Sequence, residues 1–317
     1  MRNNTNNITP LKLVLRIVLR LLMPFFLSTL ALSVTEAQLL NGKTLQPAHP
    51  QEIIEQVKPG SILILGENHG IATHRDQHVL LLNMLHEKGL KVSVGLEFLN
   101  YTDQAFVDQY LSDQLTDDQF QKSVQWQSIG FEFYKQQLRF PKIAQGFSLG
   151  LNIPRSVTSK IAKTGIEGLK PEELKLMPPQ FQLGRDSYKK RFADVIHVPA
   201  GSVLDRYFTA QSTWDDTMAW QAIQFIHAHP DQVLVIVVGE FHAQFGGGLA
   251  NRIQARDAVI KITSVSQIWA VKSLDDGTKA NWTDEEIQSE IKPSVDEGPR
   301  GDFIWVSKPL LTLDSRQ

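Results

Sequence analysis

Residues 233–239 read VLVIVVG, an uninterrupted run of aliphatic side chains that ends in glycine. The run is too short for an ordinary helix and rich in β-branched residues, so it predicts a strand buried on both faces. Strands of this kind belong to parallel sheets that carry helices on each side. Glu240, Phe241 and His242 follow immediately. This segment therefore predicts an α/β protein with titratable side chains at the end of a central strand.

Other short apolar runs, bounded by glycine or proline and separated by helical stretches, predict the rest of the sheet. They lie at residues 61–66, 91–97, 147–153, 259–265, 268–272 and 303–306. We expect a largely parallel central sheet flanked by helices. Residues 156–230 are too long for a single crossover and predict a helical lobe over the C-terminal ends of the strands.

Three parts make up the predicted domain organisation. Residues 1–37 are a signal peptide, and residues 38–272 are the α/β domain, including the lobe at about 156–230. Residues 273–317 are a polar excursion followed by a final edge strand.

The signal peptide is predicted from charge and hydropathy. Arg16 and Arg20 precede an uncharged run from Leu21 to Thr35, and small residues follow at the cleavage position. We therefore expect an exported protein, periplasmic or secreted, with no transmembrane segment in the mature chain. The alternative is an uncleaved anchor helix from Leu11, which would place both arginines in the bilayer at a cost of about 2.5–3.5 kcal/mol each.

Composition excludes several classes of protein. Of 317 residues, 42% are hydrophobic and 21% are charged, which is typical of a globular chain. Acidic residues outnumber basic ones by 34 to 32, so no basic surplus favours nucleic-acid binding. Cysteine is absent, which excludes disulfides, thiolate metal sites and a cysteine nucleophile.

Polar side chains follow four of the predicted strands. Since ligands of open α/β sheets bind outside the carboxyl ends of the strands, we expect these side chains to share one rim. The predicted strands at residues 61–66 and 233–239 each end in a Gly-Glu-x-His motif. The residues expected at the rim are Glu67, His69, Glu97, Arg155, Glu240 and His242.

This set of residues is suited to two kinds of chemistry. His69, His242 and Glu97 could together hold a divalent metal ion. The glutamates could act as a general base, and Arg155 could stabilise an oxyanion. Any one of these residues, taken alone, is more typical of a helix cap or a satisfied loop; their number at one rim favours a functional site.

Secondary candidates have weaker support. His74 and His78 are one helical turn apart, and we expect His74 and Gln77 near the rim but His78 facing solvent. Asp215 lies on a predicted helix from about residue 205 to 227, where packing within the lobe is the alternative interpretation.

Six motifs resemble the ChaN-like proteins of the haem-binding uptake, Tiki superfamily. They occur in the family's order and span most of residues 60–260. The motifs are LGENH (65–69), HRDQH (74–78), GLEFL (95–99), LNIPRSV (151–157), AQSTWDDTMA (210–219) and VVGEFH (237–242).

This resemblance implies two functions for the same fold. ChaN-like proteins are associated with haem binding and iron acquisition at the bacterial envelope, and other superfamily members look like metal-dependent or His/Glu-dependent hydrolases of ester or peptide bonds. The superfamily's paired Gly-x-x-His motifs, acid and arginine would correspond here to Glu67, His69, Glu97, Arg155 and His242. Whether the protein is an enzyme is left open.

The resemblance also implies haem, or another small molecule, as the ligand. Haem ligation in such relatives is similar to tyrosinate coordination, but no tyrosine here matches a family motif. The open candidates are Tyr101, Tyr134, Tyr188 and Tyr207. The chain lacks the cysteine of lipoprotein members, which puts membrane tethering in doubt, and the sequence leaves a homodimer open.

Overall fold

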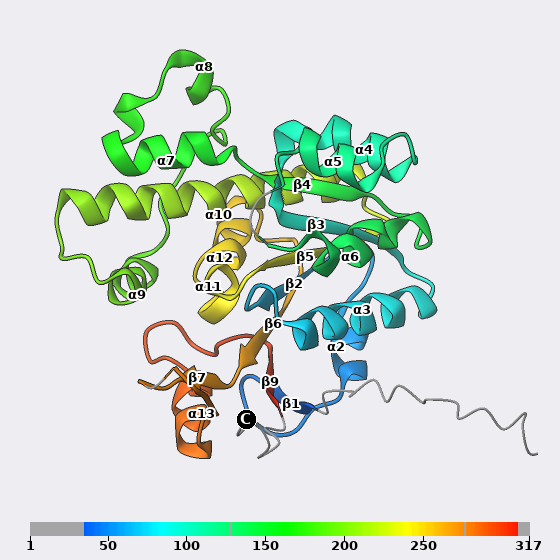
Figure 1. Ribbon diagram of the computed structural model, residues 1–317, viewed down its shortest axis with the longest axis vertical. Coiled ribbons are helices and arrows are strands. Elements are labelled where there is room, and N and C mark those ends of the chain that lie inside the picture. The colour runs from blue at the N-terminus through cyan, green and yellow to red at the C-terminus, as the bar shows by residue number, and fades with distance from the viewer. Residues whose placement is uncertain (1–34, 127–128, 276, 310–317) are drawn as a thin grey trace, which may run out of the picture. The chain divides into compact units, whose positions relative to one another are not determined.

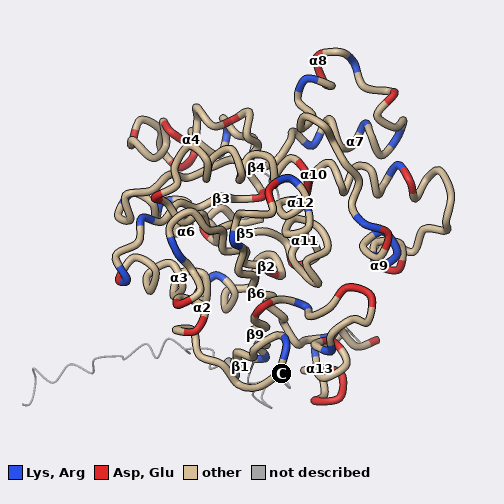
Figure 2. Tube along the Cα trace, turned by 180° about the vertical axis from the view of Figure 1, so that it is seen from behind, with Lys and Arg blue, Asp and Glu red and all other residues tan. Residues whose placement is uncertain are grey.

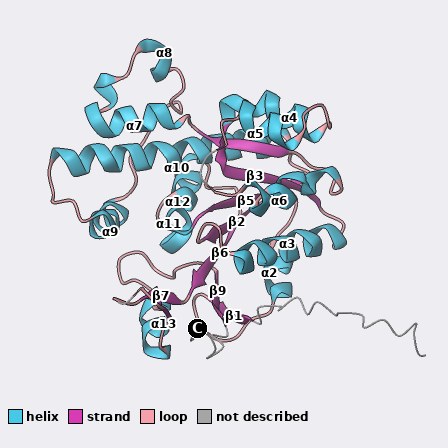
Figure 3. Cartoon of the chain, viewed as in Figure 1, coloured by secondary structure: helices cyan, strands magenta, loops and turns pink. Residues whose placement is uncertain are grey.

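The computed structural model describes residues 35–126, 129–275 and 277–309, which build a helix-flanked seven-stranded sheet (Figures 1 and 3). Its strand order is β1-β9-β6-β2-β5-β3-β4, and β1 alone runs antiparallel to its neighbour. The strands are β1 (Thr35–Asn41), β2 (Ile62–Glu67), β3 (Lys91–Asn100), β4 (Ser148–Asn152), β5 (Gln232–Gly239), β6 (Ile262–Trp269) and β9 (Phe303–Pro309); β7 (Val271–Ser273) and β8 (Lys279–Asn281) form a separate hairpin. The predicted fold class is confirmed.

Helices cover both faces of the sheet (Figure 1). The helices on one face are α2 (Pro50–Gln56), α3 (Ala72–Glu87), α4 (Gln104–Leu111), α5 (Asp117–Ser123) and α6 (Lys135–Arg139). The other face carries α10 (Ser202–Ala228), α11 (Glu240–Ala243) and α12 (Leu249–Arg256). The remaining helices are α7 (Arg155–Thr164), α8 (Pro171–Leu174), α9 (Asp186–Ile196) and α13 (Asp284–Ile291).

Alternate residues of each central strand supply the two cores. In β2, Leu63 and Leu65 pack under α2 and α3, whereas Ile62 and Ile64 pack against α10 and α12. Fully burying such a side chain contributes roughly 1.5–3 kcal/mol. Figure 2 shows the corresponding charge pattern: β5 and β6 are uncharged, and Lys, Arg, Asp and Glu lie mostly in helices and loops.

The predicted lobe ends inside α10. The last part of that helix, from Met218 to Ile226, packs on the sheet face against Leu234 and Ile236. The connection between the parallel strands β4 and β5 must run back along the sheet, and the second half of α10 makes this crossover. The lobe therefore comprises α7, α8, α9 and the first half of α10.

The prediction of an edge strand at residues 303–306 is wrong, because β9 lies between β1 and β6. The edge is β1, whose residues 35–37 belong to the predicted signal peptide; the rest of that peptide lies outside the described residues. Across the described residues, no helix is long and apolar enough to cross a membrane.

At the opposite edge, a side chain takes the place of a neighbouring strand. The Gln104 side-chain amide donates to the Ser148 carbonyl oxygen at 2.8 Å and accepts from the Gly150 N–H at 2.9 Å. The outer hydrogen-bonding groups of β4 at these positions are therefore satisfied within the protein.

Candidate functional site

The carboxyl ends of β2, β5, β3 and β4 are adjacent, and the structure brings most of the predicted residues together there. Glu67 ends β2, Glu97 lies in β3, and His242 belongs to the one-turn helix that follows β5. Arg155 is the first residue of α7, directly after β4.

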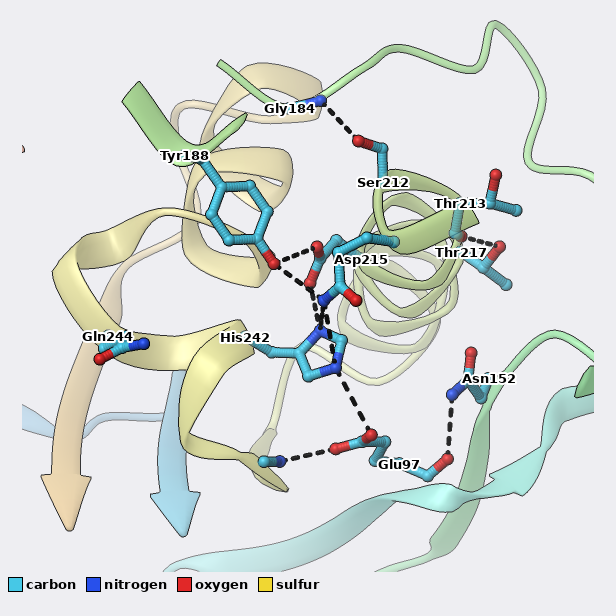
Figure 4. Close-up of polar contacts among 12 residues, drawn as sticks. Glu97, Asn152, Gly184, Tyr188, Ser212, Thr213, Asp215, Thr217, His242 and Gln244 are labelled. Carbon is cyan, nitrogen blue, oxygen red and sulfur yellow. Dashed lines mark hydrogen bonds and ion pairs between the residues drawn. The ribbon is translucent and has the colours of Figure 1, made fainter. Parts of the chain in front are cut away.

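His242 is held between two carboxylates (Figure 4). Its Nδ1 lies 2.7 Å from an Asp215 carboxylate oxygen, and its Nε2 lies 3.5 Å from Glu97 Oε1. Burial disfavours the charged ring, but the two carboxylates outweigh burial and raise the pKa of His242 to about 10. The ring is therefore an imidazolium at neutral pH.

The lobe supports this imidazolium through Asp215. The Tyr188 hydroxyl of α9 donates to the Asp215 carboxylate at 3.0 Å (Figure 4). The Gln211 amide donates to that hydroxyl at 2.9 Å. A side chain at Gly248 would place its Cβ 2.6 Å from the same carboxylate. Gly248 is thus explained by close packing against the lobe.

Glu97 joins the two histidines of the site. Its Oε2 accepts the Gly239 N–H at 2.6 Å, and it is close enough to His69 to stabilise that ring electrostatically. Burial alone would raise the pKa of Glu97, but the charge of His242 dominates and lowers it to about 2. Glu97 is therefore ionised at any ordinary pH.

His69 is the imidazole that reaches solvent. Its Nδ1 lies 3.0 Å from Glu67 Oε1, and its side chain is 36% exposed. Burial lowers the pKa of His69, but Glu67 and Glu97 together raise it above the ordinary value. Because Nδ1–H donates to Glu67, the neutral ring carries its lone pair on Nε2.

Glu67 is fixed by a second set of partners. The Tyr134 hydroxyl donates to its Oε1, and Nδ1 of His78 lies 3.8 Å from its Oε2. Burial and the charge of Glu67 raise the pKa of Tyr134, so the phenol stays protonated and continues to donate. Glu67 therefore orients His69, in the way that a carboxylate orients a catalytic histidine.

The secondary candidates on α3 lie behind the rim. His74 accepts the Asn68 N–H at 3.0 Å, and burial lowers the pKa of His74 to about 3. Gln77 donates to Ser307 at 2.9 Å. The prediction that His78 faces solvent is wrong: it is fully buried, and its Nε2 lies 2.5 Å from Gln267.

Glu240 points away from the imidazoles, contrary to the prediction that it joins them. It accepts from Ser266 and from Arg300 Nε, the latter at 3.0 Å. Burial outweighs these donors and raises the pKa of Glu240 to about 7. Glu240 therefore ties α11 to the polar excursion that carries Arg300.

This burial gives a pH-dependent prediction for Glu240→Gln. The pKa of Glu240 is about 7 in the fold against 4.5 ordinarily, so the folded state binds the extra proton between these values. The stability that wild type gains from this proton is complete below pH 4.5 and is lost as pH rises through 7. We expect the free energy of unfolding of the variant, relative to wild type, to rise by about 3 kcal/mol from pH 4.5 to 8.

Urea denaturation at several pH values measures this difference in the free energy of unfolding. His74 titrates alike in the variant and in wild type, so its contribution cancels. Glu132→Gln, at a carboxylate that is 79% exposed, is the control and should show a flat difference. A pH-independent difference for Glu240→Gln would contradict the assignment.

A cleft of about 680 Å³ opens beside the rim. Glu97, Phe98, Arg155 and Trp214 are among the residues that line it. The Phe98 ring contacts His69 edge-on with 4.8 Å between centroids, and the Trp214 ring lies 6.2 Å from that of His242. The cleft therefore lies next to both histidines.

The predicted metal site is not supported. No three His, Asp or Glu residues in the described part of the chain are arranged to hold a metal ion. His242 is the reason at this rim: both of its ring nitrogens face carboxylates, and an imidazolium has no lone pair to give. His69, His242 and Glu97 form an ion-paired cluster instead.

Four of the five tyrosines are engaged through their hydroxyls. Each donates one hydrogen bond: Tyr101 to the Leu176 carbonyl, Tyr110 to Asp117, Tyr134 to Glu67 and Tyr188 to Asp215. Tyr207, on α10, is 40% exposed and makes no hydrogen bond to any described residue.

Fold and rim together define an α/β protein with paired carboxylate–histidine groups beside a cleft. The family model of haem-binding uptake proteins of the Tiki superfamily, ChaN, matches residues 53–253, and the chain belongs to this family.

One solved structure shows the same fold, and a second is a weaker likeness. A structure of ChaN of Campylobacter jejuni with cofacially bound haem is 20% identical, covers 86% of this chain and 97% of its own, and has a TM-score of 0.60. An erythromycin esterase in its open conformation is 10% identical and covers 89% of this chain and 99% of its own, with a TM-score of 0.49. The comparison with curated protein sequences gave no match.

Among the residues that sequence reasoning missed are Tyr134, Tyr188 and Arg300. Tyr134 and Tyr188 were considered only as haem ligands, whereas each holds a carboxylate of the site. No local motif marks them, because their partners are distant in sequence. Gln211 differs from these, because it lies four residues before Asp215 on α10 and helical spacing places the two on one face.

Proposed function

We propose that this protein is an exported haem-binding protein that takes part in iron acquisition. Membership of a haem-binding uptake family supports the ligand, and the signal-peptide features of residues 1–37 support export. The observation that carries the proposal is the environment of Tyr207. Haem is the cargo, and its iron accepts a tyrosine oxygen as ligand.

Tyr207 suits this role because its hydroxyl has no competing partner among the described residues. The other four phenols already donate to buried or half-buried acceptors, and breaking those bonds would leave polar groups unsatisfied. Val203, one turn earlier on the same helix face, is 43% exposed and offers apolar surface to a porphyrin. An exposed single ligand also fits a protein that must release its cargo.

Titration with hemin tests this assignment. The purified mature chain should give a saturable shift of the Soret band, and Tyr207→Phe should weaken binding at least about tenfold. Tyr101→Phe is the matched control and should bind as wild type does. Equal binding by Tyr207→Phe and wild type would contradict the assignment, and N-terminal sequencing of exported protein, expected to begin at Gln38, tests export.

A second candidate function is hydrolysis of an ester or peptide bond without a metal ion. The orientation of His69 favours it: Glu67 fixes Nδ1, and Nε2 can take a proton from water as the water oxygen adds to the carbonyl. The same ring would return that proton to the leaving group, and Arg155 at the cleft would stabilise the oxyanion. Loss of hydrolysis in a His69→Gln variant tests this candidate.

A further inference from the structure

The two aromatic residues of the cleft lie beside the two histidines of the rim. Phe98 lies against His69, and Trp214 lies near His242, on the lobe helix α10. Both line the 680 Å³ cleft, with Glu97 between them in the rim. A ligand in contact with both rings would therefore be one side chain away from each of the two imidazoles.

The remaining lining combines a few apolar side chains, Ile129 and Ile153 among them, with polar and mostly neutral ones. Its side chains include Asn100, Thr102, Asn152, Ser156 and Ser159. Amide and hydroxyl groups supply donors and acceptors in similar number. A ligand that suits them must itself both donate and accept hydrogen bonds at many points.

Charge in the cleft disfavours a polyanion. Arg155 is the single Lys or Arg among the described lining residues, whereas phosphate chains are bound by several cations. The two lining carboxylates are already engaged, Glu97 with His242 and Asp103 with the Asn100 amide at 2.8 Å. The cleft is thus close to neutral.

Main-chain recognition of a peptide is also disfavoured. Of the strands that reach the cleft, β3 pairs with β4 on one side, with an irregularity between Leu96 and Asn100. The outer edge of β4 is already occupied by the Gln104 side chain. Aromatic faces, amides and hydroxyls remain as the recognition elements. A sugar ring matches them, because its hydroxyls both donate and accept and its C–H face packs on an aromatic ring.

We infer that the cleft binds a neutral saccharide, or the saccharide part of a larger molecule, against Phe98 and Trp214. This inference rests on the second candidate function, since it names the class of substrate that the cleft would present to His69. It places the sugar on the lobe side of the rim, apart from Tyr207.

Calorimetric titration with maltotetraose and with the tetramer of N-acetylglucosamine tests the inference. At least one of them should bind saturably, and Trp214→Ala should weaken binding at least about tenfold. Trp220→Ala is the matched control, because Trp220 lies on the same helix but packs on Tyr101 outside the cleft. Its binding should equal that of wild type.

Two outcomes overturn the inference: neither saccharide binds, or both tryptophan variants lose binding equally. Tetra-alanine, used as a peptide probe, should not bind; binding that depends on Trp214 would show a peptide cleft instead. Saccharide binding without ester hydrolysis removes the hydrolase but keeps the ligand class. Ester hydrolysis without saccharide binding removes the ligand class but keeps the hydrolase.

Discussion

Replacing Asp215 by asparagine is expected to lower the free energy of unfolding by about 3–5 kcal/mol at pH 6. The change removes one of the two carboxylates that face the buried His242 imidazolium. It also leaves the Tyr188 hydroxyl with a neutral acceptor. Urea denaturation measures the stability, and NMR titration of His242 should show its pKa falling from about 10 toward 6.5.

The sign of the pH dependence follows from the raised pKa of His242. The stability supplied by the imidazolium is complete below pH 6.5 and is lost as pH rises toward 10. The difference between Asp215→Asn and wild type should therefore be largest near pH 6 and smaller at pH 10. Asp194→Asn, at an exposed position on α9, is the control and should change stability by less than about 0.5 kcal/mol. A comparably small effect for Asp215→Asn would refute the buried ion pair.

The second large effect is expected from His69→Gln on hydrolysis of 4-nitrophenyl acetate. Removing the general base should lower kcat by roughly 10²–10⁴-fold with little change in KM. The wild-type rate should rise with pH as His69 loses its proton, with an apparent pKa above 6.5 because Glu67 and Glu97 favour the charged ring. The variant should lack this rise.

Two measurements make this result specific. His86→Gln, at an exposed histidine near the end of α3, should keep the wild-type rate. Addition of EDTA should also leave the rate unchanged, because the site holds its imidazoles with carboxylates. Turnover that is equal in His69→Gln and wild type would remove the hydrolase, and turnover that EDTA abolishes would contradict the metal-free mechanism.

Much of the sheet could be predicted because its strands are continuous apolar runs. Val233–Gly239 and residues 61–66 are uniformly buried, so their pattern depends little on tertiary context. The position of β9 could not be predicted in this way. It depends on β1, whose residues lie on both sides of the predicted signal-peptide boundary, and strand order is a long-range property.

The two Gly-Glu-x-His segments look alike in sequence but differ in space. After β2 the chain leaves the strand as a loop, so Glu67 and His69 can turn toward each other and bond. After β5 the chain enters α11, where residues two apart point about 200° apart around the axis. His242 therefore faces the lobe, and Glu240 faces Arg300.

Asp215 shows where local pattern fails at the site. Its spacing on α10 fits lobe packing as well as function, and its partner His242 is 27 residues away. Only the return of α10 across the sheet brings the two together. The supporting Tyr188 comes from yet another helix, so the complete group is a property of the fold.

The hydrogen bonds between the Gln104 side-chain amide of α4 and the edge strand β4 have a consequence for solubility. An uncovered outer strand is a template on which a second molecule can polymerise through its main chain. Here the sites that an incoming chain would use at Ser148 and Gly150 are already filled by a side chain that copies a peptide group. The protein thereby resists growth of intermolecular β-structure from this end without a charged or proline-rich edge.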